Sequence, residues 1–194
     1  MIQDLIAEGT TMILKGLQER LGLDFDDVNF KDTPSRVSRM YNEICSGLKE
    51  TDEQVEEILK SAFPCTNDHL IVIKDIEVFS LCPHHLLPVH YKIHVGYLPN
   101  GEVLGISKLP RLIEVLAKRP VLQEQLVEDV VSNLMKLDGC LGAGCVAEGK
   151  HYCMIMRGAK QSQSTTITSS MKGNFLENGG ELKQEFLKLV YGGR

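Results

Sequence analysis

The chain has 194 residues and a formal net charge of −5, so no excess of positive charge favours general nucleic-acid binding. Its hydrophobic fraction of 43% is typical of a globular protein, and this length can bury the core of one domain with an extension. No stretch approaches the roughly 20 apolar residues of a membrane span, and the first residues lack a secretory signal pattern, so we expect a cytoplasmic protein without a membrane partner.

The first third of the chain is predicted to be helical. Apolar residues recur at helical spacing over residues 6–17, and the Thr-Pro pair at 33–34 is typical of a helix start. Thr51 and Gln54 have the spacing of a capping box, which predicts a third helix. We therefore expect an N-terminal helical region over residues 1–64.

Strands and helices then alternate over residues 65–194, the second expected domain. Two strands rich in β-branched and aromatic residues are followed by two amphipathic helices, a hairpin-like pair around Gly149 and a terminal helix. The predicted strands cover residues 70–80, 90–99, 143–149 and 151–158, and the predicted helices begin near Ser107, Leu122 and Leu182. Two strand pairs separated by a helical pair indicate an α+β domain with an antiparallel sheet.

One segment, SLCPHHLLPVHYKIH at residues 80–94, holds four of the six histidines and one of the six cysteines. Cys82 and His85 are close enough in sequence to reach one ion from a turn. His151 and Cys153 form a second cluster, and in a strand their side chains would project to the same face. In a reducing compartment cysteines are thiols or metal ligands, and a Cys/His/Cys set suits Zn²⁺ with a fourth position open for water.

Zinc at such a site lowers the pKa of water toward neutrality, and His84 and His151 would lie near that water as proton-transfer groups. The alternatives are a structural zinc or no metal. His90 and His94 are interpreted as strand-pairing or surface residues. The other four cysteines are interpreted as ordinary buried or turn residues.

A group of cations indicates an anionic ligand. Ser107, Lys108 and Arg111 open a predicted helix, where free N–H groups and the helix dipole favour anions. Arg157 follows the second Cys/His cluster, so three cations near a metal site point to a phosphorylated substrate. Glu124 lies early in the next helix, where a carboxylate is favourable even without a function. Each cation taken alone is more typical of a solvated surface charge than of a ligand contact.

Across these stretches the chain resembles the GTP cyclohydrolase I family. The matching motifs are, in chain order, DTPSRV, SLCPHHLLP, HVGYLPNGEVLGISKLPRLIEVLAKR, LQEQL, HYCMIMRG, TTITSSMKGNF and EFLKL. The resemblance implies the tunnelling fold, an α+β fold whose antiparallel four-stranded sheet carries a helical pair on one face, with an N-terminal helical extension. It also implies a homodecamer with active sites at subunit interfaces.

The resemblance implies a role for each matching residue. It implies zinc ligation by Cys82, His85 and Cys153, and proton transfer by His84 and His151. It implies that Glu124 anchors the guanine edge, with Gln123 beside it in contact with substrate. The implied triphosphate and pocket contacts are Ser107, Lys108, Arg111, Arg157 and, from a neighbouring subunit, Arg36.

The implied reaction is zinc-dependent hydrolysis of GTP at C8, with release of formate and rearrangement to 7,8-dihydroneopterin triphosphate. One alternative is a tunnelling-fold paralogue acting on another purine or pterin in 7-deazaguanine metabolism. A second is a non-catalytic, zinc-binding oligomer or pterin-binding regulator. The sequence leaves open the downstream pathway (folate, tetrahydrobiopterin or modified guanine), a regulatory partner, and Fe²⁺ or Mn²⁺ in place of zinc.

The chain departs from the family pattern at a few positions. Pro83 stands where glutamate is usual, and His90 and Tyr91 replace commoner small residues. Changes around metal ligands can cost about 10- to 100-fold in metal affinity or activity. Because no ligand is lost, we expect activity to survive.

Overall fold

The computed structural model describes residues 4–66 and 68–192. The chain divides into two compact units, residues 1–46 and 47–194. The domain boundary that the sequence places after residue 64 stays a prediction. None of the described helices is both long and apolar enough to cross a membrane.

The first unit is helical, as predicted. α1 (Leu5–Leu21) begins after Asp4, whose side chain caps it, and the 3-10 turn η1 (Val28–Phe30) leads to α2 (Thr33–Ile44). The N-cap of α2 is an aspartate, one residue before the threonine that the sequence predicts. The buried Ser38 hydroxyl donates to the Asp4 carboxylate at 2.9 Å, so the cap of α1 also binds α2.

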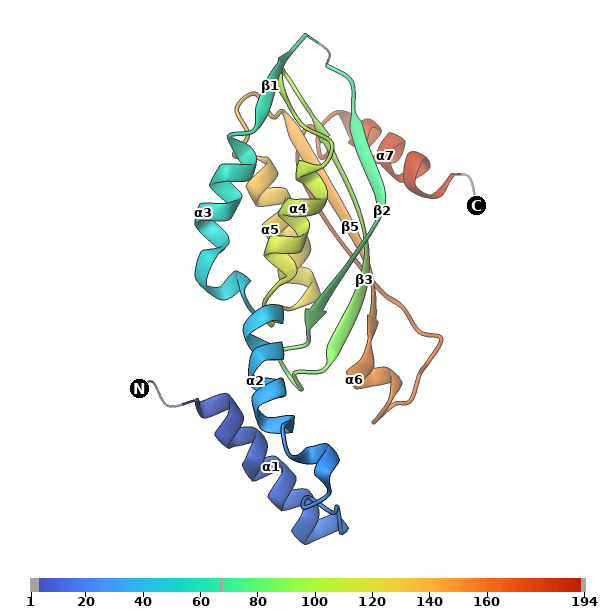
Figure 1. Cartoon of the computed structure of the whole chain (residues 1–194). Coiled ribbons are helices and arrows are strands. Elements are labelled where there is room, and N and C mark those ends of the chain that lie inside the picture. Colours follow the sequence, from blue (N-terminus) through green and yellow to red (C-terminus); the bar gives the residue numbers. More distant parts are fainter. Residues whose placement is uncertain (1–3, 67, 193–194) are drawn as a thin grey trace. The chain divides into compact units, whose positions relative to one another are not determined.

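The second unit contains the sheets and the remaining helices. In chain order its elements are α3 (Gly47–Leu59), β1 (Ala62–Cys65), β2 (Ile71–Leu81), β3 (Pro88–Leu98), β4 (Gly101–Leu104), α4 (Lys108–Ala117), α5 (Gln123–Leu134), β5 (Gly142–His151), α6 (Tyr152–Ile155), β6 (Thr166–Gly173), η2 (Asn178–Gly180) and α7 (Glu181–Tyr191). Four strands form an antiparallel sheet in the order β2-β3-β5-β6, and β1 pairs with β4 in a separate sheet (Figure 1). The expected α+β class with a four-stranded antiparallel sheet is confirmed.

Helices cover both faces of this sheet (Figure 1). α4 and α5 pack on the face of β3 that carries Tyr91, Ile93 and Val95, all fully buried. On the opposite face α7 places Phe186 against Phe175, with ring centroids 5.7 Å apart. Because side chains alternate along a strand, the two cores take alternate residues of the sheet. The predicted helical pair on one face is confirmed, and α7 adds a cover on the other.

The second strand pair differs from the prediction. The sequence places a turn at Gly149, but β5 runs straight through this glycine, which pairs with both neighbouring strands. Residues 152–155 form the single helical turn α6, and β6 is the fourth strand of the sheet. The expectation that His151 and Cys153 share a strand face is therefore wrong, because Cys153 lies inside a helical turn.

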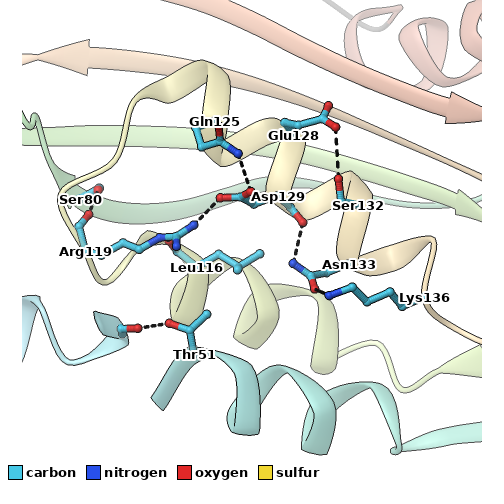
Figure 2. A network of polar contacts seen from close by, with 11 residues as sticks. Thr51, Ser80, Leu116, Arg119, Gln125, Glu128, Asp129, Ser132, Asn133 and Lys136 are labelled. Carbon is cyan, nitrogen blue, oxygen red and sulfur yellow. Dashed lines mark hydrogen bonds and ion pairs between the residues drawn. The ribbon is translucent and has the colours of Figure 1, made fainter. Parts of the chain in front are cut away.

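α3 begins earlier than the sequence predicts. Thr51 and Gln54 do not form a capping box, because the helix starts at Gly47 and Thr51 lies within it, donating its hydroxyl to the Gly47 carbonyl (Figure 2). A Cβ at Gly47 would lie 2.7 Å from the carbonyl oxygens of Val115 and Lys118 at the end of α4. Close packing of α3 on α4 therefore selects glycine at this helix start.

Candidate functional site

Three candidate metal ligands, two thiols and one imidazole, converge at one end of the four-stranded sheet. Cys82 follows β2 directly, His85 lies in the turn before β3, and Cys153 lies in α6. One ligand atom from each lies within 4.8 Å of the others, and Cys82 Sγ is 3.7 Å from Cys153 Sγ. This separation is too long for a disulfide, whereas two Zn–S bonds of about 2.3 Å at the tetrahedral angle place their sulfurs about 3.8 Å apart. The two sulfurs thus have the spacing of a tetrahedral metal site, and a ring nitrogen of His85 lies within 4.8 Å of both.

The turn that carries Cys82 and His85 is closed by its own backbone. The Leu86 N–H donates to the Cys82 carbonyl at 2.8 Å, and the Cys82 N–H donates to the Leu87 carbonyl at 2.9 Å. Pro83 occupies the second position of this turn and is exposed. Proline favours this position, because its fixed φ suits the turn and no backbone N–H is needed there. The residue that departs from the family pattern therefore fits the local backbone.

Two predicted site residues contact these candidate ligands. His84 Nδ1 lies 3.6 Å from Cys82 Sγ. Arg157 Nη1 donates to His85 Nε2 at 2.9 Å. Because a guanidinium only donates, this nitrogen carries the lone pair of a neutral imidazole, the form that binds metals. Arg157 must release this hydrogen bond if a metal binds through His85 Nε2.

Protonation of the cysteines opposes metal binding. Burial raises the pKa of the Cys153 thiol, the adjacent Cys82 adds to this shift, and Arg157 opposes it. Without a metal, Cys153 therefore favours the thiol over the thiolate. A metal must displace these protons, so its affinity depends on pH.

His151 ends β5 and is half-buried beside this cluster. Its Nε2 lies 2.8 Å from Gln123 Oε1, and its ring meets that of Tyr91 edge-on, with centroids 6.1 Å apart and an interplanar angle of 85°. Burial lowers the pKa of His151, and the charge of Glu124 opposes this shift only in part. A neutral imidazole near a carboxylate is suited to accepting a proton.

Gln123 and Glu124 open α5 with contrasting environments. Glu124 is exposed, as a ligand contact requires. Gln123 is only 2% exposed, and its amide N–H groups donate to the carbonyls of Ala147 at 3.0 Å and Thr166 at 2.9 Å. The Gln123 side chain, predicted to contact substrate, therefore contacts protein in this structure.

The other predicted anion contacts lie elsewhere. Ser107 is the N-cap residue of α4, and Lys108 and Arg111 lie in its first turn, where both line a hollow of about 230 Å³ beside α3. Within the described part of the chain, no hydrogen bond or ion pair joins these three residues to the Cys/His cluster. Arg36 belongs to the first unit, where it is exposed and pairs with Asp32 at 3.5 Å.

The two remaining histidines of the β3 strand lie outside the cluster. His90 stacks on Phe79 with ring centroids 4.7 Å apart. His94 is a strand residue, as predicted, but it is fully buried rather than at the surface, and it accepts a hydrogen bond from the Asp75 N–H at 3.1 Å. Its depth follows from the cover that α7 provides, which the strand sequence alone does not reveal.

Tyr91 is the site neighbour to which the sequence assigned no role. It is fully buried, and its hydroxyl has no hydrogen-bond partner among the described residues. Burial raises its pKa, and the nearby Cys82 and Glu124 add to the shift. The alternating positions of Val89, Tyr91 and Ile93 predict that Tyr91 faces the core. They do not predict its contact with His151.

Known proteins resemble this chain over nearly its whole length. The sequence profile of the GTP cyclohydrolase I family matches residues 8–191. The protein named GTP cyclohydrolase 1 from Clostridium perfringens (strain ATCC 13124) is 38% identical over 188 residues, which cover 97% of each chain. The protein of the same name from Campylobacter jejuni subsp. doylei is 40% identical over 91% of this chain and 92% of its own. That from Teredinibacter turnerae is 41% identical over 87% of this chain and 90% of its own. The chain belongs to the GTP cyclohydrolase I family.

Proposed function

We propose that this protein hydrolyses GTP at C8, releases that carbon as formate and rearranges the remainder to 7,8-dihydroneopterin triphosphate. One water is consumed for each GTP converted. The observation that carries the proposal is the convergence of Cys82, His85 and Cys153 from two separate segments, in a chain of the GTP cyclohydrolase I family. Three protein ligands are typical of a catalytic site, because a fourth position stays open.

The donor set fits Zn²⁺. Two thiols and one imidazole are soft to borderline ligands, and the sulfur separation of 3.7 Å agrees with tetrahedral bonding. When bound there, Zn²⁺ would act as a Lewis acid and bring the pKa of water near neutrality. Cys82, His85 and Cys153 would hold it.

The chain's own residues would bind the substrate and move protons. His84, whose Nδ1 lies 3.6 Å from Cys82 Sγ, and His151, two residues before Cys153, would exchange protons with the guanine imidazole ring as it opens. Glu124, exposed at the start of α5, would accept hydrogen bonds from the guanine edge. The triphosphate would contact Arg157 beside His85, with further contacts from Ser107, Lys108, Arg111 and, from a neighbouring subunit, Arg36.

Two other functions receive less support. A paralogue of 7-deazaguanine metabolism acting as a reductase would need a catalytic cysteine in place of the metal triad, whereas both cysteines here lie at metal-ligand spacing. A non-catalytic zinc protein would not need His84, His151 or Glu124 beside its metal. The cyclohydrolase proposal uses all of these groups.

The proposal extends to assembly and location. A homodecamer is supported by family membership and by apolar side chains left exposed on α1, among them Met12 (74%) and Leu21 (77%). A cytoplasmic location is supported by the cysteines, since none of the six forms a disulfide in the described part of the chain. Mass measurement of the native assembly tests the first point.

Three variants test the site. Cys153→Ser should lose bound zinc and product together, because it removes a ligand. His151→Ala should retain zinc but lose product, because it removes only a proton-transfer group. Cys45→Ser, a matched change in the first unit, should retain both. Turnover by Cys153→Ser without bound metal would overturn the proposal.

A further inference from the structure

The amide of Gln123 has only one orientation that satisfies its surroundings. Its nitrogen lies 3.0 Å from the carbonyl oxygen of Ala147 on β5 and 2.9 Å from that of Thr166 on β6. Carbonyl oxygens only accept, so they require the amide NH₂, and its two hydrogens are matched one to each carbonyl. The opposite orientation would set Gln123 Oε1 against two acceptors in a buried position, which is costly.

This orientation fixes the hydrogen bond to His151. With both amide hydrogens used, Gln123 presents only Oε1 to His151 Nε2, 2.8 Å away. An amide oxygen cannot donate, so the hydrogen in this contact must belong to the imidazole. The neutral ring then carries its proton on Nε2 and its lone pair on Nδ1.

The packing around the amide leaves it little freedom to move. Gln123 is 2% exposed and begins α5, whose backbone holds it over β5. Gly149 lies beneath it, and a Cβ there would collide with Gln123 Oε1 and lie 2.8 Å from Tyr91 Cε1. The ring of Tyr91 stands edge-on to the imidazole of His151, with centroids 6.1 Å apart. Glycine at this strand position therefore makes room for the amide.

We propose that Gln123 is a positioning residue, which holds His151 as the Nε2–H tautomer so that Nδ1 is the nitrogen able to accept a proton. The catalytic meaning rests on the proposed function, in which His151 transfers protons to and from the substrate. The tautomer itself does not depend on that function. A buried group that orients a histidine in this way commonly decides which nitrogen is reactive.

The direct test is ¹⁵N NMR of the full-length, zinc-loaded protein with labelled histidine, at a pH where His151 is neutral. His151 is assigned by the signal lost in His151→Gln. We expect Nε2 to be the protonated nitrogen and Nδ1 the unprotonated one. Protonation at Nδ1 would overturn the proposal. This readout needs neither turnover nor a Gln123 variant, so it separates failure of this proposal from failure of the cyclohydrolase assignment.

Gln123→Met supplies the kinetic test, because it keeps length and burial but removes every amide hydrogen bond. We expect a fall in kcat of about tenfold or more with KM and zinc content unchanged, and a mixed tautomer at His151. The matched control is Gln125→Met on the same helix, where an exposed amide donates to Asp129 at 2.7 Å. Its kcat and tautomer should equal those of the parent. A Gln123→Met protein with parental kcat would contradict the proposal, and if it does not fold, the tautomer of the parent decides.

Discussion

Replacing Gly149 by alanine adds a single methyl group against the Gln123 amide, which holds His151 in place. The added Cβ would collide with Gln123 Oε1 and lie 2.8 Å from Tyr91 Cε1, closer than carbon atoms pack. The amide must shift, which weakens its bonds to two carbonyls and to His151, each worth about 1 kcal/mol net. Overpacking lowers the free energy of unfolding by about 1–3 kcal/mol. Alanine also reduces the conformational entropy of the unfolded chain, which raises the free energy of unfolding by about 0.4–1 kcal/mol. We expect a net loss of about 2–4 kcal/mol.

Thermal unfolding and steady-state kinetics measure the effect. For a chain of this size about 1 kcal/mol corresponds to roughly 2–4 °C, so Gly149→Ala should lower Tm by about 5–15 °C. It should also lower kcat, because the imidazole loses its orientation. Gly9→Ala is the control, since nothing lies within 4 Å of its Cβ in α1 and alanine favours a helix, so Tm should hold or rise slightly. Parental Tm and kcat in Gly149→Ala would refute the packing of Gln123 over this glycine.

Three further predictions concern the metal, the second core and a polar network. Because the pKa of Cys153 is raised, zinc must displace thiol protons, so the zinc affinity should fall as the pH falls. The fall should reach about 100-fold per pH unit if two protons leave. A pH-independent zinc affinity, measured by competition titration, would contradict this prediction, because it would mean that the thiols are already ionised. Phe186→Ala should cost about 3–5 kcal/mol in urea unfolding, because its fully buried ring holds α7 on the sheet; a loss below about 1 kcal/mol would contradict that packing. Asp129→Asn weakens the half-buried ion pair with Arg119, which joins α5 to the end of α4 (Figure 2), and should lower the free energy of unfolding by about 1–2 kcal/mol. The control Glu114→Gln removes an exposed ion pair and should lower it by less than about 0.5 kcal/mol. Equal losses for the two variants would refute the distinction by burial.

The sequence predicted the elements whose signals are local and long. α4, α5 and α7 have apolar stripes at helical spacing, and β2 and β3 are rich in β-branched and aromatic residues. It failed at α6, because one helical turn is too short for a periodic pattern and its residues, YCMI, suit a strand equally well. β6 was missed as a strand because TITSSMKG, at the edge of the sheet, has only two large apolar residues, Ile167 and Met171, which is too few for a clear alternating pattern.

The candidate site divides in the same way. Cys82, His85 and Cys153 could be predicted because thiols and imidazoles carry their chemistry in the residue type, and the family motifs align them. The contact between Gln123 and His151 could not, because it joins residues 28 apart with no shared pattern, and its geometry depends on two backbone carbonyls. Residue types indicate candidate ligands, but the fold is needed to show which groups orient the side chains around them.

The most direct test of the central claim is a product assay on the purified, zinc-loaded chain incubated with GTP. Formate is measured in one sample, and neopterin fluorescence is measured in a second after oxidation and dephosphorylation. The proposed reaction predicts formate and neopterin in a one-to-one ratio, both lost in Cys153→Ser. Absence of neopterin from the zinc-loaded parent protein, or formate release without it, would contradict the assignment.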